Sequence, residues 1–167
     1  MIPTEIIIHC SATRPEWLEG EPLSRAVKTI DSWHKARGWK GIGYHYVVGR
    51  NGKVLPGRPE SEQGAHVRGH NQNTLGICLL GGFGGSADDT FNDHFTKEQR
   101  LALENLIVDI QTRHDITILS GHNIYANKGC PCFDVSKEFS LGKITVPQVP
   151  SLFDSIIAFI SKLFSKV

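Results

Sequence analysis

The apolar positions along this chain follow two different periods, which predict a mixture of strands and helices. Unbroken apolar runs, such as Ile6 to Ile8 before His9, are typical of strands buried on both faces. Asn51-Gly52 between two alternating segments is a strong hairpin signal. The segments with strand patterns are residues 4–9, 44–48, 53–55, 75–80 and 116–119.

Two internal segments show the helical period instead. The first runs from about Leu23 to Arg37 and ends at Gly38, a residue suited to the position after a helix. Its apolar stripe is expected to face a sheet; it contains Val27, Ile30, Trp33 and His34. The second begins at the capping box Thr96-x-x-Gln99 and continues to about His114. We therefore predict an α/β fold in which helices flank a mixed central β-sheet, within one domain over residues 1–143.

The C-terminal residues have a different pattern. Residues 144–150 contain Pro147 and Pro150 and predict a stiff linker. Residues 151–167 then place apolar side chains at helical spacing, with serines, lysines and one aspartate opposite, which predicts an amphipathic helix. The segment is short for a membrane span. Three interpretations remain open: docking on its own domain, contact with a membrane surface, or self-association.

Composition narrows the function classes. Among 167 residues, 18 Lys and Arg balance 17 Asp and Glu, so we expect no nucleic-acid partner. The first residues show no positive and apolar leader pattern, so we expect a protein made in the cytosol, without a signal peptide. A cytosolic origin disfavours disulfides among the four cysteines. Cys78, inside an apolar run, is expected to be a core residue.

Three soft-metal ligands are the most informative residues. His9 ends a predicted strand, while His122 and Cys130 lie in an irregular segment near the end of the predicted domain. Two imidazoles and one thiolate fill three positions of a tetrahedral zinc site and leave the fourth open to water. The trio therefore indicates metal-assisted hydrolysis. Cys10 and Cys132 each neighbour a proposed ligand and remain rival candidates.

Four separated motifs carry a family resemblance. They are Ile7-Ile8-His9-Cys10-Ser11-Ala12-Thr13, Gly43-Tyr44-His45-Tyr46, Asn73-Thr74-Leu75-Gly76-Ile77-Cys78-Leu79 and Lys128-Gly129-Cys130-Pro131-Cys132-Phe133-Asp134. Together they resemble the type 2 N-acetylmuramoyl-L-alanine amidases of the peptidoglycan-recognition-protein superfamily, and above all the lysozyme-amidases of T-odd coliphages. The resemblance covers about residues 4–140. It implies a mixed sheet of five or six strands with a zinc cleft along one face.

The resemblance also implies a reaction and its residues. The reaction is hydrolysis of the amide between N-acetylmuramic acid and L-alanine in bacterial peptidoglycan. His9, His122 and Cys130 become ligands of one Zn²⁺ per chain, and Tyr44 and Lys128 become catalytic. Lys128 suits stabilisation of an oxyanion, and Tyr44 suits orientation of the attacking water. Where relatives often carry Glu after the second histidine, this chain has Asn123 and Ile124, so Tyr44, Lys128 and the activated water remain candidates for proton transfer.

Residues 63–71 resemble the wall of the substrate cleft in relatives. Within them, His66, Arg68 and Asn71 are expected to contact substrate. Trp39 is a candidate for stacking on sugar or for packing. We expect a monomeric phage endolysin that waits in the host cytoplasm and acts on the wall after release.

Two other functions fit parts of the pattern. One is a recognition protein that binds peptidoglycan without cleaving it; the complete set His9, His122, Cys130 and Tyr44 argues against this. The other is regulation of an RNA polymerase, which the coliphage relatives perform through a surface involving their N-terminal segment. Only eight residues precede His9 here, so that activity is not expected.

Overall fold

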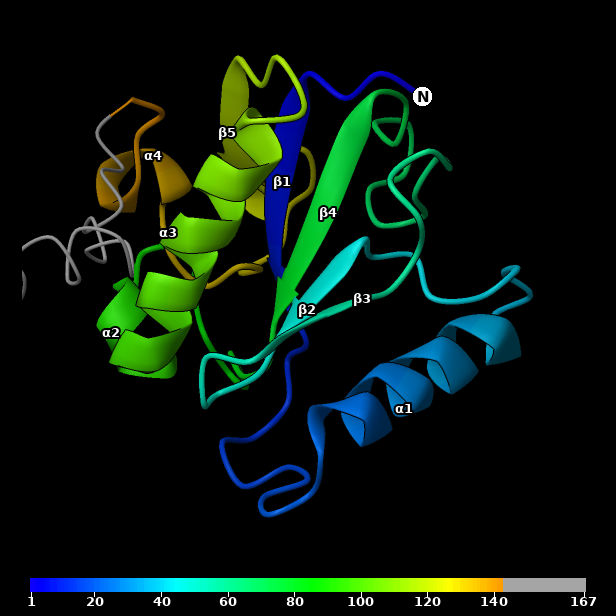
Figure 1. The fold of residues 1–167 in the computed structure, drawn as a ribbon. Coiled ribbons are helices and arrows are strands. Elements are labelled where there is room, and N and C mark those ends of the chain that lie inside the picture. The colour runs from blue at the N-terminus through cyan, green and yellow to red at the C-terminus, as the bar shows by residue number, and fades with distance from the viewer. Residues whose placement is uncertain (143–167) are drawn as a thin grey trace, which may run out of the picture.

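The computed structural model of the chain describes residues 1–142 (Figure 1). The predicted linker over 144–150 and the amphipathic helix over 151–167 lie outside these residues. In chain order the elements are β1 (Glu5–Cys10), α1 (Leu23–Ala36), β2 (Tyr46–Val48), β3 (Val54–Pro56), β4 (Thr74–Leu79), α2 (Phe91–His94), α3 (Lys97–Gln111), β5 (Ile118–Gly121), the 3₁₀ turn η1 (His122–Ile124) and α4 (Val135–Glu138).

The strands form one mixed five-stranded sheet in the order β3-β2-β4-β1-β5. β4 is the central strand, and β1 lies between β4 and the edge strand β5 and pairs in parallel with both. β2 and β3 form the predicted antiparallel hairpin, and β2 joins β4 in parallel. The mixed sheet predicted from the strand patterns is confirmed.

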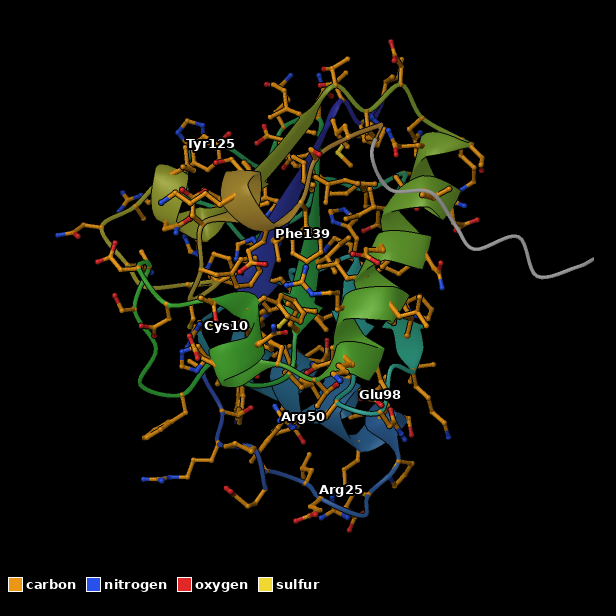
Figure 2. All side chains as sticks on the ribbon, turned by 90° about the vertical axis from the view of Figure 1, so that its left-hand side faces the viewer. Cys10, Arg25, Arg50, Glu98, Tyr125 and Phe139 are labelled. Atoms are coloured by element: carbon orange, nitrogen blue, oxygen red, sulfur yellow. The ribbon has the colours of Figure 1, made fainter. Side chains whose placement is uncertain are left out.

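Helices cover the two faces of this sheet unequally (Figure 1). On one face, Ile6 and Ile8 of β1 belong to a large buried cluster with Leu103 and Ile107 of α3. Figure 2, viewed from the left-hand side of Figure 1, shows Phe139 of the same cluster over the sheet beside α3. On the other face, α1 packs over the hairpin side through a smaller cluster that contains Ile30 and Val47. Because side chains alternate along a strand, His9 points away from the α3 face.

Local sequence signals explain the start of α3 and the end of α1. At the start of α3, Gln99 N–H donates to Thr96 Oγ1 and Thr96 N–H donates to Gln99 Oε1, both at 3.1 Å, which confirms the capping box. Gly38 follows α1 with a φ of +83°, a conformation that glycine adopts without strain.

The predicted buried stripe of α1 is correct for Ile30 and His34, but the expectation for Trp33 is wrong. Ala26, Ile30 and His34 are the buried residues of α1, whereas the Trp33 side chain is 40% exposed. Trp33 lies one position before His34 on the helix, about 100° around its axis, and therefore at the edge of the buried stripe. Its ring stacks on that of Trp17 at 5.2 Å instead of entering the sheet.

Among residues 1–142, no helix combines the length and apolar character needed to cross a membrane.

Candidate metal centre

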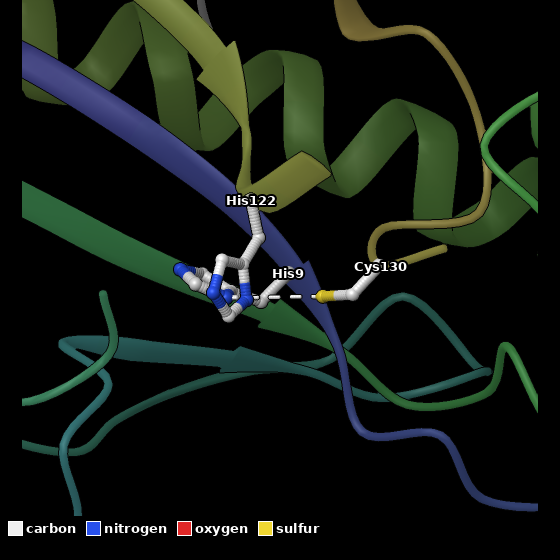
Figure 3. A group of neighbouring side chains, drawn as sticks. All are labelled: His9, His122 and Cys130. Atoms are coloured by element: carbon white, nitrogen blue, oxygen red, sulfur yellow. Dashed lines mark hydrogen bonds between the residues drawn. The ribbon is translucent and has the colours of Figure 1, made fainter. Parts of the chain in front are cut away.

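The sheet register brings the two predicted histidine ligands together. Ile8 of β1 pairs with Gly121 of β5 in parallel, so the residues that follow them, His9 and His122, leave the same edge of the sheet. Their rings lie 4.7 Å apart, centroid to centroid. The chain then turns through η1 and returns with Cys130, whose Sγ lies 3.8 Å from His9 Nδ1 (Figure 3).

The geometry of the three ligands fits one zinc ion. One ligand atom from each of His9, His122 and Cys130 lies within 4.8 Å of the others. A nitrogen and a sulfur bound to the same tetrahedral zinc are separated by about 3.6 Å, close to the 3.8 Å between His9 Nδ1 and Cys130 Sγ. In the part of the chain that the structure describes, this is the one cluster of His, Cys, Asp and Glu with metal-binding geometry.

The far side of the His9 ring is held by a hydrogen-bonded chain. His9 Nε2 lies 3.1 Å from His66 Nδ1, and His66 Nε2 lies 3.3 Å from Thr74 Oγ1. Thr74 Oγ1 in turn donates to the carbonyl oxygen of His70 at 3.0 Å. If His9 and His66 each carry a proton on Nε2, every group in this series of hydrogen bonds donates to the next one. His9 Nδ1 then carries no proton and is free toward Cys130. This is the tautomer a metal ligand needs.

Space for the His66 ring depends on two glycines. A Cβ on Gly76 would lie 2.6 Å from this ring, and one on Gly64 would lie 2.5 Å from it. Gly76 is the residue of β4 that pairs with Ile7, two positions before His9. Any larger residue at either position would therefore push His66 away from His9.

The protonation of the histidines suits metal binding. Burial lowers the pKa of His9 well below its ordinary value, and the neighbouring His66 and His122 lower it further. Burial also lowers the pKa of His122, with a contribution from the positive charge of Lys128. Burial lowers the pKa of His66 to about 3. All three rings are therefore neutral near pH 7, the form in which an imidazole nitrogen can ligate.

Backbone geometry prepares Cys130 as the sulfur ligand. The backbone N–H of Cys10 donates to Cys130 Sγ at 3.2 Å. This N–H donor favours the thiolate, the form that binds zinc, and so opposes the neighbouring Cys10 thiol and burial, which together raise the pKa of Cys130 well above its usual value. Cys10 and Cys132, the rival ligands, belong to the buried cluster on the α3 side, and neither is part of the metal-binding group among the described residues.

Tyr44 lies beside His9, with ring centroids 5.1 Å apart. The backbone just before it is fixed on both sides: Gly43 N–H donates to His34 Nδ1 at 2.8 Å, and Ala65 N–H donates to Gly43 O at 3.1 Å. A Cβ at residue 43 would lie 2.1 Å from Ala65 O, so this approach requires glycine. Burial raises the pKa of Tyr44 well above its usual value, which keeps the hydroxyl protonated and able to donate.

Two adjoining cavities reach His122, and the smaller of them also reaches Cys130. One, of about 700 Å³, extends along His66, Arg68 and Asn71. The other, of about 230 Å³, contains Tyr44, Cys10 and Cys130. His122, Lys128 and Arg37 line both. No Asp or Glu of the described residues lines either cavity. Besides the histidines, the side chains there that can move a proton include Tyr44, Lys128 and Tyr125, whose hydroxyl donates to Glu5 Oε1.

The three residues expected to contact substrate lie in different settings. Arg68 is exposed at the larger cavity. Asn71 lines that cavity too, but its Oδ1 accepts the backbone N–H groups of His66 and Val67 at 2.8 and 2.9 Å, so it holds the loop. His66 is only 8% exposed and is bonded to His9. The structure thus places His66 behind His9 as well as at the cavity wall.

Arg37 is a cavity residue that the sequence alone does not reveal. It follows the last turn of α1 and lines both cavities, while Trp39 lines the larger one against the His34 ring at 4.6 Å. No local signal distinguishes Arg37 from an ordinary basic residue at a helix end, because its place in the cleft depends on how α1 packs on the sheet.

Comparisons with known proteins agree with this arrangement. The model of the family "N-acetylmuramoyl-L-alanine amidase" matches residues 1–133. The endolysin of Escherichia phage T7 is 38% identical over 134 residues, which cover 79% of this chain and 82% of the relative. The solved N-acetylmuramoyl-L-alanine amidase LysC from Clostridium intestinale URNW is 28% identical, with a TM-score of 0.65 over 81% of each chain. Drosophila PGRP-LB, at 24% identity, shares the fold with a TM-score of 0.68 over 89% of this chain and 86% of its own.

Proposed function

The chain belongs to the N-acetylmuramoyl-L-alanine amidase family, and from this premise we propose that it is a zinc-dependent endolysin. Its reaction is hydrolysis of the amide that joins N-acetylmuramic acid to L-alanine in bacterial peptidoglycan. The observation that carries the zinc dependence is the convergence of His9 Nδ1, Cys130 Sγ and the His122 ring at the junction of two cavities.

His9, His122 and Cys130 would hold the ion beside the two cavities, both of which His122 lines. When bound, zinc polarises the scissile carbonyl and lowers the pKa of a water toward ~7. Lys128 is exposed at the mouth of both cavities, where its ammonium group can stabilise the developing oxyanion. Tyr44 donates a hydrogen bond to a reacting oxygen, because its hydroxyl stays protonated at neutral pH.

The charges of the cleft suit an anionic peptide. Arg37, Arg68 and Lys128 supply three positive charges to the larger cavity, and none of residues 1–142 contributes a carboxylate to its lining. Stem peptides of peptidoglycan carry several carboxylates, and Arg is well suited to bind these in a bidentate manner. Arg68 and Arg37 would therefore bind the peptide side of the scissile bond, and Trp39 offers a flat surface for the sugar.

The setting follows from the same proposal. The enzyme would be synthesised in the host cytoplasm as a monomer, reach the wall after the membrane is breached, and act there. Residues 151–167 would contact the membrane surface through the apolar stripe of the sequence.

A pair of cysteine variants tests the proposal. Cys130→Ser should lose zinc and amidase activity together, because serine replaces the soft ligand with a hydroxyl. Cys78→Ser is the matched control: it changes a buried cysteine of β4 outside the ligand group and should keep one zinc per chain. Full activity of zinc-free Cys130→Ser would refute the metal mechanism. Tight binding of peptidoglycan by the zinc-loaded wild type without cleavage would make it a recognition protein instead.

A further inference from the structure

Two cysteines that the proposed reaction does not use lie against each other next to the metal centre. Cys10 Sγ, at the end of β1, is 3.6 Å from Cys132 Sγ, in the loop that follows Cys130. The two residues are 122 positions apart in the chain. Figure 2 shows where Cys10 lies in the molecule, within the buried cluster on the α3 side. Cys132 is 1% exposed and Cys10 6% exposed.

The surrounding backbone holds this thiol pair tightly. Cys132 Sγ donates to the carbonyl oxygen of Gly82 at 3.3 Å. A Cβ on Gly82 would lie 2.9 Å from both sulfurs, and one on Gly85 would lie 2.6 Å from Cys132 Sγ. Residues 81–85, the glycine segment, therefore pack directly on the two thiols and keep them in contact.

We propose that Cys10 and Cys132 are a modification site, an intramolecular disulfide formed by exchange with a small-molecule or protein disulfide. One cysteine thiolate attacks the oxidant disulfide, forms a mixed disulfide and releases one thiol. The second cysteine then attacks the protein sulfur of that mixed disulfide and releases the other thiol. In total, two protein thiols and one oxidant disulfide give one protein disulfide and two thiols, so the oxidant receives both electrons.

Cys10 is the entry point for the oxidant. It lines the smaller cavity beside Tyr44 and Cys130, whereas Cys132 lies behind it, under the glycine segment. The other two cysteines are poor partners. Cys130 serves as the metal ligand under the proposed function. Cys78 Sγ contacts the Leu79 carbonyl oxygen, and no other thiol of residues 1–142 lies within hydrogen-bonding distance of it.

The bond would connect the two segments of the chain that carry the ligands His9 and Cys130. Cys10 is adjacent to the ligand His9, and Cys132 lies two residues after the ligand Cys130. A Cys10–Cys132 bond would join the strand that carries one ligand to the loop that carries another, without consuming any ligand. Cross-linking residues this far apart should raise the melting temperature by on the order of 5–10 °C. The bond itself is inferred from the contact between the two thiols. The expectation that the protein meets an oxidising environment rests on the proposed function, because peptidoglycan lies outside the reducing cytoplasm.

The test uses the zinc-loaded full chain incubated with glutathione disulfide under native conditions. We expect the protein to lose two hydrogens in mass and two of its four titratable thiols. Non-reducing peptide mapping should join the Cys10 peptide to the peptide that contains Cys132. The melting temperature should rise and return to its starting value on reduction, while one zinc per chain remains bound.

Two controls make the assignment decisive. Cys132→Ser should abolish the cross-link and the melting shift, because it removes one of the two thiols. The serine hydroxyl can still donate to Gly82 O, so the variant should fold. Cys78→Ser should preserve both. Should Cys132→Ser fail to fold, the zinc content of oxidised wild type still decides, because a bond through Cys130 would release the metal. Zinc release on oxidation would overturn the proposal. So would the absence of a cross-link in the folded protein under conditions in which the unfolded chain is readily oxidised.

Discussion

We expect His66 to strengthen zinc binding at the His9, His122 and Cys130 site, although His66 is not one of the ligands. Replacing it with alanine removes the acceptor 3.1 Å from His9 Nε2 and leaves that N–H buried without a partner, since His9 is fully buried. A buried donor that loses its partner costs about 1–3 kcal/mol. Loss of an outer hydrogen bond to a metal-binding histidine weakens metal affinity about 10–100-fold, or about 1.4–2.7 kcal/mol. The two ranges agree, so we expect zinc affinity of His66→Ala to fall by this factor.

The assay is competition for zinc with a chromophoric chelator, run on three variants. His66→Asn places an amide oxygen near the lost Nδ1 and should recover most of the affinity. His45→Ala is the matched control: His45 is also buried and its ring lies 5.8 Å from that of His66, but it bonds Gly76 N–H and Glu62 O. If His66→Ala bound zinc as tightly as wild type and only raised KM, His66 would be a substrate contact and the positioning role would be refuted.

Three further changes have definite expected outcomes. Tyr44→Phe should lower kcat about 10²-fold with zinc content unchanged, because it removes one donor to a reacting oxygen; an unchanged kcat in a peptidoglycan assay would exclude that role. Burial, with nearby positive charges, lowers the pKa of His34 to about 4, below the ~6.5 of the unfolded chain, so the unfolded state binds more protons and stability falls as pH drops from about 6.5 toward 4. His34→Asn keeps an acceptor for Gly43 N–H and should remove about 2 kcal/mol of the stability lost between pH 7 and pH 5, measured by urea unfolding; an unaltered pH slope would contradict this. Deleting residues 148–167 should preserve cleavage of purified peptidoglycan and weaken lysis of intact cells; equal losses in both assays would assign the segment to the fold.

The sequence specified the sheet and the ligand trio because short-range signals were strong. Apolar runs marked β1 and β4, Asn51-Gly52 marked the hairpin, and the capping box marked the start of α3. The ligands could be predicted because their residue types and flanking motifs are distinctive. Their convergence, however, depends on β1 and β5 being parallel neighbours, which places His9 and His122 at one edge.

Features that depend on packing could not be read from the sequence. Nothing local shows that Trp33 leaves the buried face of α1 while Arg37 reaches the cleft. The His66 sequence context indicates a polar wall, but its bond to His9 requires the two glycines of separate segments that admit its ring. The contact between Cys10 and Cys132 likewise exists only once the loop after Cys130 folds against the end of β1.

The most direct test of zinc-dependent amide hydrolysis is mass spectrometry of purified peptidoglycan after digestion with the enzyme, with and without a strong zinc chelator. We expect free stem peptides beginning at L-alanine, absent after chelation and restored by added zinc. Release of the same peptides from enzyme verified to be free of metal would contradict it.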